Sequence, residues 1–229
     1  MKSRALIFKV FVVVWFSFIL ISCGNEPAKT PTASAQPEAA QEVEKSTIVF
    51  FGNSLTAAFG IDPELGFVSR IQQRIDSLNL PYTCVNAGNS GETTHGGLER
   101  LDWVLRKPVS ILVLELGAND GLRGLDPPTA KANLIKMINI YREANPEGKV
   151  LLLGIMSPPS MGEEYTREFN PIFKEISEET GCALVPFLLD GVAGNQKLNL
   201  PDGIHPTAEG HAILTETVWK ELKPLLKTD

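Results

Sequence analysis

Short apolar segments alternate with segments of helical spacing along the chain from residue 47 to residue 222. The apolar segments are rich in β-branched and aromatic residues, which predicts strands at 47–51, 82–86, 111–115, 150–155 and 183–185. The spacing between them predicts helices at 63–78, 98–105, 126–141, 163–180 and 206–222. Strict alternation with apolar strands indicates an α/β fold, in which a mostly parallel sheet is covered by helices on both faces.

The beginning of the chain has the composition of a targeting segment. A basic start precedes an apolar run over 10–21, and about 12 apolar residues are too few to cross roughly 30 Å of hydrocarbon. Residues 1–22 are therefore predicted to be a signal peptide. Leu20-Ile21-Ser22-Cys23 resembles a bacterial lipobox, which implies a lipid on Cys23. An ordinary signal peptide or a membrane helix that happens to contain Cys23 is the alternative interpretation.

The next segment changes character. Residues 23–46 contain Ala, Pro, Glu, Gln, Thr and Ser but no aromatic residue, which is typical of a disordered linker. Residues 47–229 have the length of one domain with a full core. Removal of residues 1–22 takes away three basic residues and leaves 18 basic against 27 acidic residues, a formal charge of −9. Such an acidic domain argues against nucleic-acid binding.

Polar, glycine-containing loops follow the first three predicted strands, at 52–54, 87–89 and 117–120. In parallel sheets, ligands bind beyond the carboxyl ends of the strands. The first loop lacks the later glycines of a dinucleotide fingerprint, and the chain has no Gly-Lys-Ser/Thr sequence for a phosphate-binding loop. The loops therefore favour a use other than nucleotide binding, although the pattern leaves a flavodoxin-like binder open.

One serine, one histidine and one aspartate form a candidate catalytic set. Ser54 directly follows the first strand, and Asp202 precedes His205 by three residues at the start of the last helix. A serine hydroxyl needs a base to accept its proton, and a carboxylate on Nδ1 leaves Nε2 of that base facing the serine. Taken alone, Asp202 and His205 also fit a turn and a helix start with no chemical role.

A tetrahedral intermediate also needs hydrogen-bond donors for its oxyanion. The candidates are the backbone N–H groups of Ser54 and Gly88 and the side-chain amide of Asn119, each from a different strand end. Taken singly, Gly88 fits a plain turn glycine, and Asn119 fits a loop residue that supports the backbone.

Four blocks of sequence resemble the marker blocks of the GDSL, or SGNH, hydrolase superfamily: Gly52-Asn53-Ser54-Leu55, Gly88, Gly117-Ala118-Asn119-Asp120 and Asp202-Gly203-Ile204-His205-Pro206. Further segments at 86–94, 97–103, 114–125 and 186–192 resemble the bacterial thioesterase, lysophospholipase and arylesterase branch. The resemblance implies a flavodoxin-like three-layer sandwich with strand order 2-1-3-4-5 and no metal or cofactor. It also implies that Ser54 is the nucleophile, His205 the base and Asp202 its partner, with Gly88 and Asn119 as oxyanion donors.

The sequence departs from the family pattern at one position, where Asn53 replaces the acidic residue of the family's name. Because Asp202 already serves His205, Asn53 need not impair the triad. An asparagine still makes local hydrogen bonds at a turn, but a local charge is lost. The expected consequence is a shift in the pH optimum.

The resemblance implies that substrates are acyl esters, including aryl esters, lysophospholipids and thioesters. A chain tethered in the cell envelope, facing the periplasm or exterior, would not meet cytosolic acyl-CoA, which favours lipid esters. We expect a monomer bound to the membrane through its lipid, with an acyl groove formed by apolar loop residues: Leu122, Leu125, Pro158, Pro159 and Met161. The alternatives are a carbohydrate acetylesterase with the same triad and a non-enzymatic envelope lipoprotein.

Overall fold

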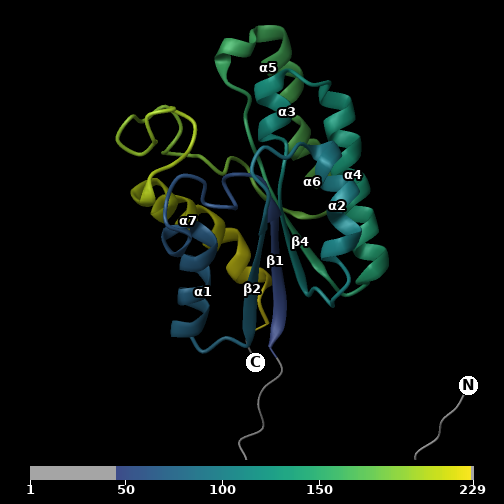
Figure 1. Cartoon of the computed structure of the whole chain (residues 1–229). Helices are drawn as coiled ribbons and strands as arrows, with labels where there is room; N and C mark the ends of the chain where they lie inside the picture. Colours follow the sequence, from purple (N-terminus) through teal and green to yellow (C-terminus); the bar gives the residue numbers. More distant parts are fainter. Residues whose placement is uncertain (1–44, 228–229) are drawn as a thin grey trace, which may run out of the picture. The chain divides into compact units, whose positions relative to one another are not determined.

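A computed structural model describes residues 45–227 of the chain (Figure 1). The predicted signal peptide, Cys23 and all but the end of the predicted linker lie outside the described residues. The first strand begins at Ser46, so the last residue of that linker belongs to the sheet.

The sheet has five parallel strands in the order β2-β1-β3-β4-β5. The strands are β1 Ser46–Gly52, β2 Tyr82–Gly88, β3 Ile111–Glu115, β4 Lys149–Leu153 and β5 Ala183–Val185. All five residues of β3 are buried, as expected of a central strand covered on both faces. The predicted fold class and strand order are confirmed.

Five longer helices cover the sheet in two layers. They are α1 Phe67–Ser77, α2 Thr94–Val104, α4 Pro127–Ala144, α6 Ile172–Thr180 and α7 Ala208–Leu222. Figure 1 shows α1 and α7 on one face and α2, α4 and α6 on the other. In the described part of the chain, no helix combines the length and apolar character that crossing a bilayer requires.

Side-chain caps define where three of these helices begin. Thr93, Asp126 and Thr207 stand just before α2, α4 and α7, and each side chain accepts a hydrogen bond from a backbone N–H in the first turn. A cap of this kind is worth about 1 kcal/mol because it satisfies an N–H group that has no partner within the helix.

Two predicted helices are interrupted. The segment at 63–78 divides into the 3₁₀ turn η1 Pro63–Leu65 and α1 at Gly66, whose backbone is extended. Only a glycine fits there, since a Cβ would lie 2.6 Å from the Cβ of Ala58. The segment at 163–180 divides into α5 Glu163–Phe169 and α6 at Pro171, which has no N–H to continue α5. The prediction of single helices was wrong at both places.

Three short elements were not predicted from the sequence. They are α3 Ala118–Arg123, η2 Pro159–Met161 and η3 Lys223–Leu225. The first of them begins directly after β3, so it holds the loop at the carboxyl end of that strand in a fixed conformation.

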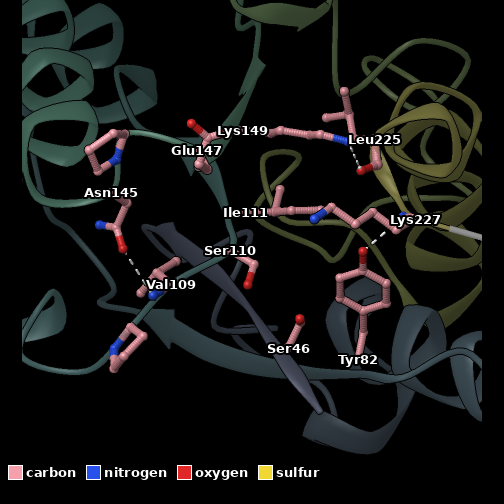
Figure 2. Close-up of a pocket in the computed structure, with 13 residues that line it drawn as sticks. Ser46, Tyr82, Val109, Ser110, Ile111, Asn145, Glu147, Lys149, Leu225 and Lys227 are labelled. Carbon is pink, nitrogen blue, oxygen red and sulfur yellow. Dashed lines mark hydrogen bonds between the residues drawn. The ribbon is translucent and has the colours of Figure 1, made fainter. Parts of the chain in front are cut away.

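A pocket of about 300 Å³ lies at the amino-terminal edge of the sheet (Figure 2). Two of its polar groups tie the end of the chain to the sheet: Lys149 Nζ donates to the carbonyl of Leu225, and the N–H of Lys227 donates to Tyr82 Oη at 2.8 Å. The polar groups of this pocket therefore have a structural role, because they hold the end of the chain against the sheet. It lies at the edge opposite to the loops that follow the strands.

Candidate active site

The loops at the carboxyl edge of the sheet bring Ser54, His205 and Asp202 into one hydrogen-bonded chain. His205 Nε2 lies 2.9 Å from Ser54 Oγ, and His205 Nδ1 lies 2.7 Å from Asp202 Oδ2. Ser54 and His205 are 151 positions apart in the sequence, so only the tertiary fold makes them neighbours. The arrangement is that of a nucleophile, a base and the carboxylate that orients the base.

The loop before α7 is built to hold His205. Asp202 Oδ1 accepts the backbone N–H groups of Ile204 at 2.8 Å and His205 at 3.0 Å, while Oδ2 faces the imidazole. Gly203 has a φ of +73°, a left-handed conformation that suits glycine. Hydrogen bonds from the His205 backbone, its side chain and the Ile204 backbone lower the pKa of Asp202 to about 2. Asp202 is therefore a carboxylate at neutral pH.

The turn after β1 is organised by a buried acid, Glu115, at the end of β3. Its carboxylate accepts the backbone N–H of Asn53 at 3.1 Å, Asn53 Nδ2 at 2.9 Å, the backbone N–H of Thr56 at 3.3 Å and Thr56 Oγ1 at 2.9 Å. Burial raises the pKa of Glu115 to about 7, although the four hydrogen bonds oppose this shift. Nothing in the sequence pattern indicated this network.

These contacts engage the backbone N–H groups around the serine and leave one free. The N–H of Leu55 donates to Asn53 Oδ1 at 3.1 Å, and the N–H of Ala57 donates to the Asn53 carbonyl at 3.0 Å. Within residues 45–227, the N–H of Ser54 has no acceptor. It is therefore free to donate to an oxyanion that forms beside Ser54 Oγ.

Asn119 and Gly88 behave differently as oxyanion donors. Asn119 lines the same cavity as Ser54, and one N–H of its amide donates to the Glu92 carbonyl at 3.0 Å, which leaves the second N–H free to bind a ligand. The N–H of Gly88 already donates to Asn86 Oδ1 at 2.9 Å, and a Cβ at Gly88 would lie 2.4 Å from the nitrogen of Ala57. In this structure the N–H of Gly88 is therefore engaged, and the glycine permits close packing of two backbones.

Gly91 is the candidate that the sequence reasoning missed. It precedes Glu92, whose carbonyl binds Asn119, and its φ of +82° is left-handed. In the part of the chain that the structure describes, its N–H has no acceptor. The stretch at 86–94 contains both glycines, and spacing alone does not tell which N–H is engaged.

The other two histidines have different surroundings. His211 is buried, and its Nδ1 accepts the N–H of Phe67 at 3.2 Å. Burial lowers the pKa of His211 to about 4, so it is neutral at physiological pH. His95 is exposed on α2 beside Glu99. Neither of them belongs to the hydrogen-bonded chain of Ser54.

A cavity of about 680 Å³ opens beside Ser54 and His205. Most of its wall is apolar and comes from the loops after β3 and β4 and from 187–194, with Leu122, Ile155, Met156, Pro158, Pro159, Phe187 and Leu189 among the lining residues. Three of the five expected groove residues line it, whereas Leu125 and Met161 do not. An extended apolar group could therefore lie next to the serine hydroxyl.

Known proteins of similar sequence or structure include esterases and a thioesterase/lysophospholipase. The chain is 42% identical to Esterase TesA of Pseudomonas aeruginosa over 189 residues, which cover 81% of this chain and 92% of that protein. It is 31% identical to Thioesterase 1/protease 1/lysophospholipase L1 of Escherichia coli over 185 residues, which cover 80% and 86% of the two chains. The psychrotrophic esterase EstA from Pseudoalteromonas sp., in a crystal structure inhibited by monoethylphosphonate, is similar with a TM-score of 0.73 and 32% identity, covering 79% of this chain and 98% of that one.

The sequence match to a family extends over most of the fold. Residues 50–213 match the GDSL-like Lipase/Acylhydrolase family, a span that begins within β1 and includes all three residues of the hydrogen-bonded chain and the residues that line the cavity. This protein belongs to the GDSL-like lipase/acylhydrolase family.

Proposed function

We propose that this protein is a serine ester hydrolase that cleaves acyl esters through a covalent acyl-enzyme on Ser54. The observation that carries the proposal is the hydrogen-bonded chain from Ser54 through His205 to Asp202 at the mouth of an apolar cavity. The names of its relatives agree with it, since they include an esterase, an arylesterase and a thioesterase/lysophospholipase.

The geometry supports a two-step acyl transfer. Ser54 Oγ attacks the ester carbonyl while its proton passes to His205 Nε2, and Asp202 stabilises the imidazolium through Nδ1–H. The N–H of Ser54 and the amide of Asn119 stabilise the oxyanion. Gly91 is a further candidate donor, because its N–H has no acceptor within the described residues and the next residue, Glu92, binds Asn119. His205 then gives its proton to the leaving alcohol. In the second step, water attacks the acyl-enzyme with His205 as base, which releases the carboxylic acid and restores Ser54.

The cavity favours acyl chains longer than acetate. Its volume of about 680 Å³ is larger than an acetyl group requires, and its wall is mostly apolar. Each methylene of an acyl chain that is buried in it contributes about 0.8 kcal/mol to binding. We infer that the substrates are lipid esters such as lysophospholipids, rather than acetylated sugars. Thioesters with similar acyl chains fit the same cavity.

Hydrolysis of p-nitrophenyl esters from acetate to palmitate tests this function. The full chain in detergent is compared with its Ser54→Ala variant, and both are treated with a fluorophosphonate probe. We expect activity that is highest above acetate, together with labelling that the substitution abolishes. A folded wild type that neither hydrolyses nor labels would favour a non-enzymatic binding protein, and activity on acetate alone would favour the carbohydrate acetylesterase.

We also propose that the protein is anchored in the cell envelope by a lipid on Cys23 and faces the periplasm or exterior. The support is the sequence Leu20-Ile21-Ser22-Cys23 after a basic and apolar start. Metabolic labelling with an alkynyl fatty acid tests it, with Cys23→Ser as the control. Labelling that persists in the variant, or none in the wild type, would contradict the anchor.

A further inference from the structure

The buried pair formed by Asn53 and Glu115 lies directly beneath the proposed nucleophile, and neither residue belongs to the triad. Asn53 is 0% exposed and Glu115 is 1% exposed. The four groups that donate to the Glu115 carboxylate all come from Asn53 and Thr56, the two residues on either side of Ser54 and Leu55. The carboxylate of β3 therefore binds the turn after β1 at both of its ends.

The Asn53–Glu115 pair is closely packed against Gly52, so its side chains have little space to move. A Cβ on Gly52 would lie 2.1 Å from Thr56 Oγ1 and 2.6 Å from Glu115 Oε2. The absence of a side chain at Gly52 is what lets the carboxylate reach the turn. Any larger residue there would displace one of the two groups.

The amide of Asn53 has a defined direction in this network. Its Nδ2 donates to Glu115 Oε1 at 2.9 Å, and its Oδ1 accepts the N–H of Leu55 at 3.1 Å. Reversal of the amide would place two oxygens opposite each other at Glu115 and two N–H groups opposite each other at Leu55. The amide of Asn53 and the carboxylate of Glu115 are therefore complementary in their hydrogen-bond donors and acceptors.

This network has a consequence for the proposed catalysis. The N–H groups of residues 53, 55, 56 and 57 are all engaged, while that of Ser54 is free within the described residues. We propose, on the basis of the function inferred above, that Asn53 and Glu115 are positioning residues that orient the turn so that the N–H of Ser54 serves the oxyanion. Neither residue touches the substrate. Each acts through the backbone of the turn.

Exchange of the two functional groups provides a sharp test. In Glu115→Gln, two amide nitrogens face each other. In Asn53→Asp, which restores the acidic residue of the family pattern, two carboxyl groups face each other and have to share a proton. In the double variant Asn53→Asp/Glu115→Gln, the carboxylate at position 53 still accepts the N–H of Leu55. The amide nitrogen at position 115 then donates to the other oxygen of that carboxylate. The oxygen of that amide still accepts the donors from Thr56 and from the backbone of residue 53.

The four full-length proteins are compared in detergent at pH 8 for kcat, KM, the rate of fluorophosphonate labelling and thermal unfolding. We expect Glu115→Gln to lower kcat and the labelling rate about tenfold or more while KM changes less than about twofold, because an oxyanion donor contributes mainly to the transition state. Asn53→Asp is expected to lose less, because its two carboxyl groups can share a proton. The double variant is expected to recover to within about threefold of wild type. Asn145→Asp, at the opposite edge of the sheet, makes the same chemical change and is expected to leave kcat unchanged.

The proposal is wrong if the single variants lower only the unfolding temperature, or if the double variant is no more active than the weaker single variant. If a single variant does not fold, Thr56→Val and Thr56→Ser replace it, since only the serine keeps the hydroxyl that donates to Glu115. Equal kcat values for these two would overturn the proposal. A folded wild type that neither labels nor hydrolyses would instead overturn the hydrolase function itself.

Discussion

The phenyl ring of Phe59 lies against the imidazole of His205, with ring centroids 4.7 Å apart and planes inclined by 47°. Phe59 is 49% exposed, and it follows Ala58, which has an unusual φ of +56° for a residue other than glycine. The turn thus holds an exposed aromatic ring in place beside the proposed base. This contact limits the orientations that the imidazole can adopt and shields one side of it from water.

Substitution of Phe59 by Ala is expected to lower kcat/KM about twofold to tenfold, since aromatic pairs of this kind contribute about 0.5–1.5 kcal/mol. Phe59→Tyr keeps the ring and is expected to retain the wild-type value. Steady-state kinetics with a p-nitrophenyl ester measure both variants. Equal activity of the Ala and Tyr variants would show that the ring does not position His205.

Asp202→Asn is expected to lower kcat by about 10² to 10⁴, because the amide oxygen can keep the backbone contacts while its nitrogen faces Nδ1 of His205. The imidazole would then adopt the tautomer that cannot accept a proton from Ser54. Because the loop contacts are preserved, thermal unfolding at pH 7 is expected to change little. A large loss of stability with little loss of kcat would contradict this division of roles.

Two buried groups are expected to have opposite effects on stability between pH 4.5 and 6.5. Glu115 has a pKa raised from 4.5 to about 7 by burial, so the folded state keeps its proton longer and stability falls as pH rises through this range. His211 has a pKa lowered from 6.5 to about 4 by burial, so the unfolded state takes up its proton first and stability falls as pH decreases. The two contributions to the pH dependence of the free energy of unfolding therefore largely cancel in the wild type.

Chemical denaturation at several pH values checks this expectation. Glu115→Gln removes one slope, so its free energy of unfolding is expected to rise with pH, by at most about 1.4 kcal/mol per unit. His211→Gln removes the other, so its free energy of unfolding is expected to fall with pH. Parallel curves for the two variants would show that these groups do not titrate as their burial implies.

A larger side chain in the cavity wall is expected to shorten the preferred acyl chain. Leu122 lines the cavity and is 40% exposed, so Leu122→Trp narrows the space without filling the core. Activity on octanoate and longer esters is expected to fall about tenfold relative to acetate. Leu65→Trp, at a position that is 42% exposed and outside the cavity wall, is the matched control and should leave the chain-length profile unchanged. An unchanged profile for Leu122→Trp would place the acyl chain elsewhere.

The sheet was predictable because periodicity and local composition report on burial. The bounds of β3 and β5 agree with the prediction. The helix break at Gly66 lies where this glycine packs closely against Ala58, and the break at Pro171 lies at a residue without an N–H. The rule that loops after parallel strands meet at one edge applied to the loop of Ser54. The pairing of Ser54 with His205 was expected from the chemistry of the two side chains and from the family resemblance.

The supporting groups of the site were not predictable in this way. Glu115 is the last residue of an apolar run, and nothing in that pattern shows that its carboxylate is buried and bonded to the turn that carries Ser54. The choice between Gly88 and Gly91 depends on which N–H meets a side-chain acceptor. The partner of each N–H group depends on the tertiary structure, and no periodic pattern of residues in the sequence reports it.

The separation of 151 positions between Ser54 and His205 has a consequence for biosynthesis. A ribosome that has released the first 200 residues has delivered the nucleophile, all five strands and most of the cavity wall, but not the base. The growing chain therefore cannot acylate itself on Ser54 before α7 docks and brings the last loop into place. Appearance of esterase activity during synthesis or refolding would thus time the final docking event, rather than the earlier formation of the sheet.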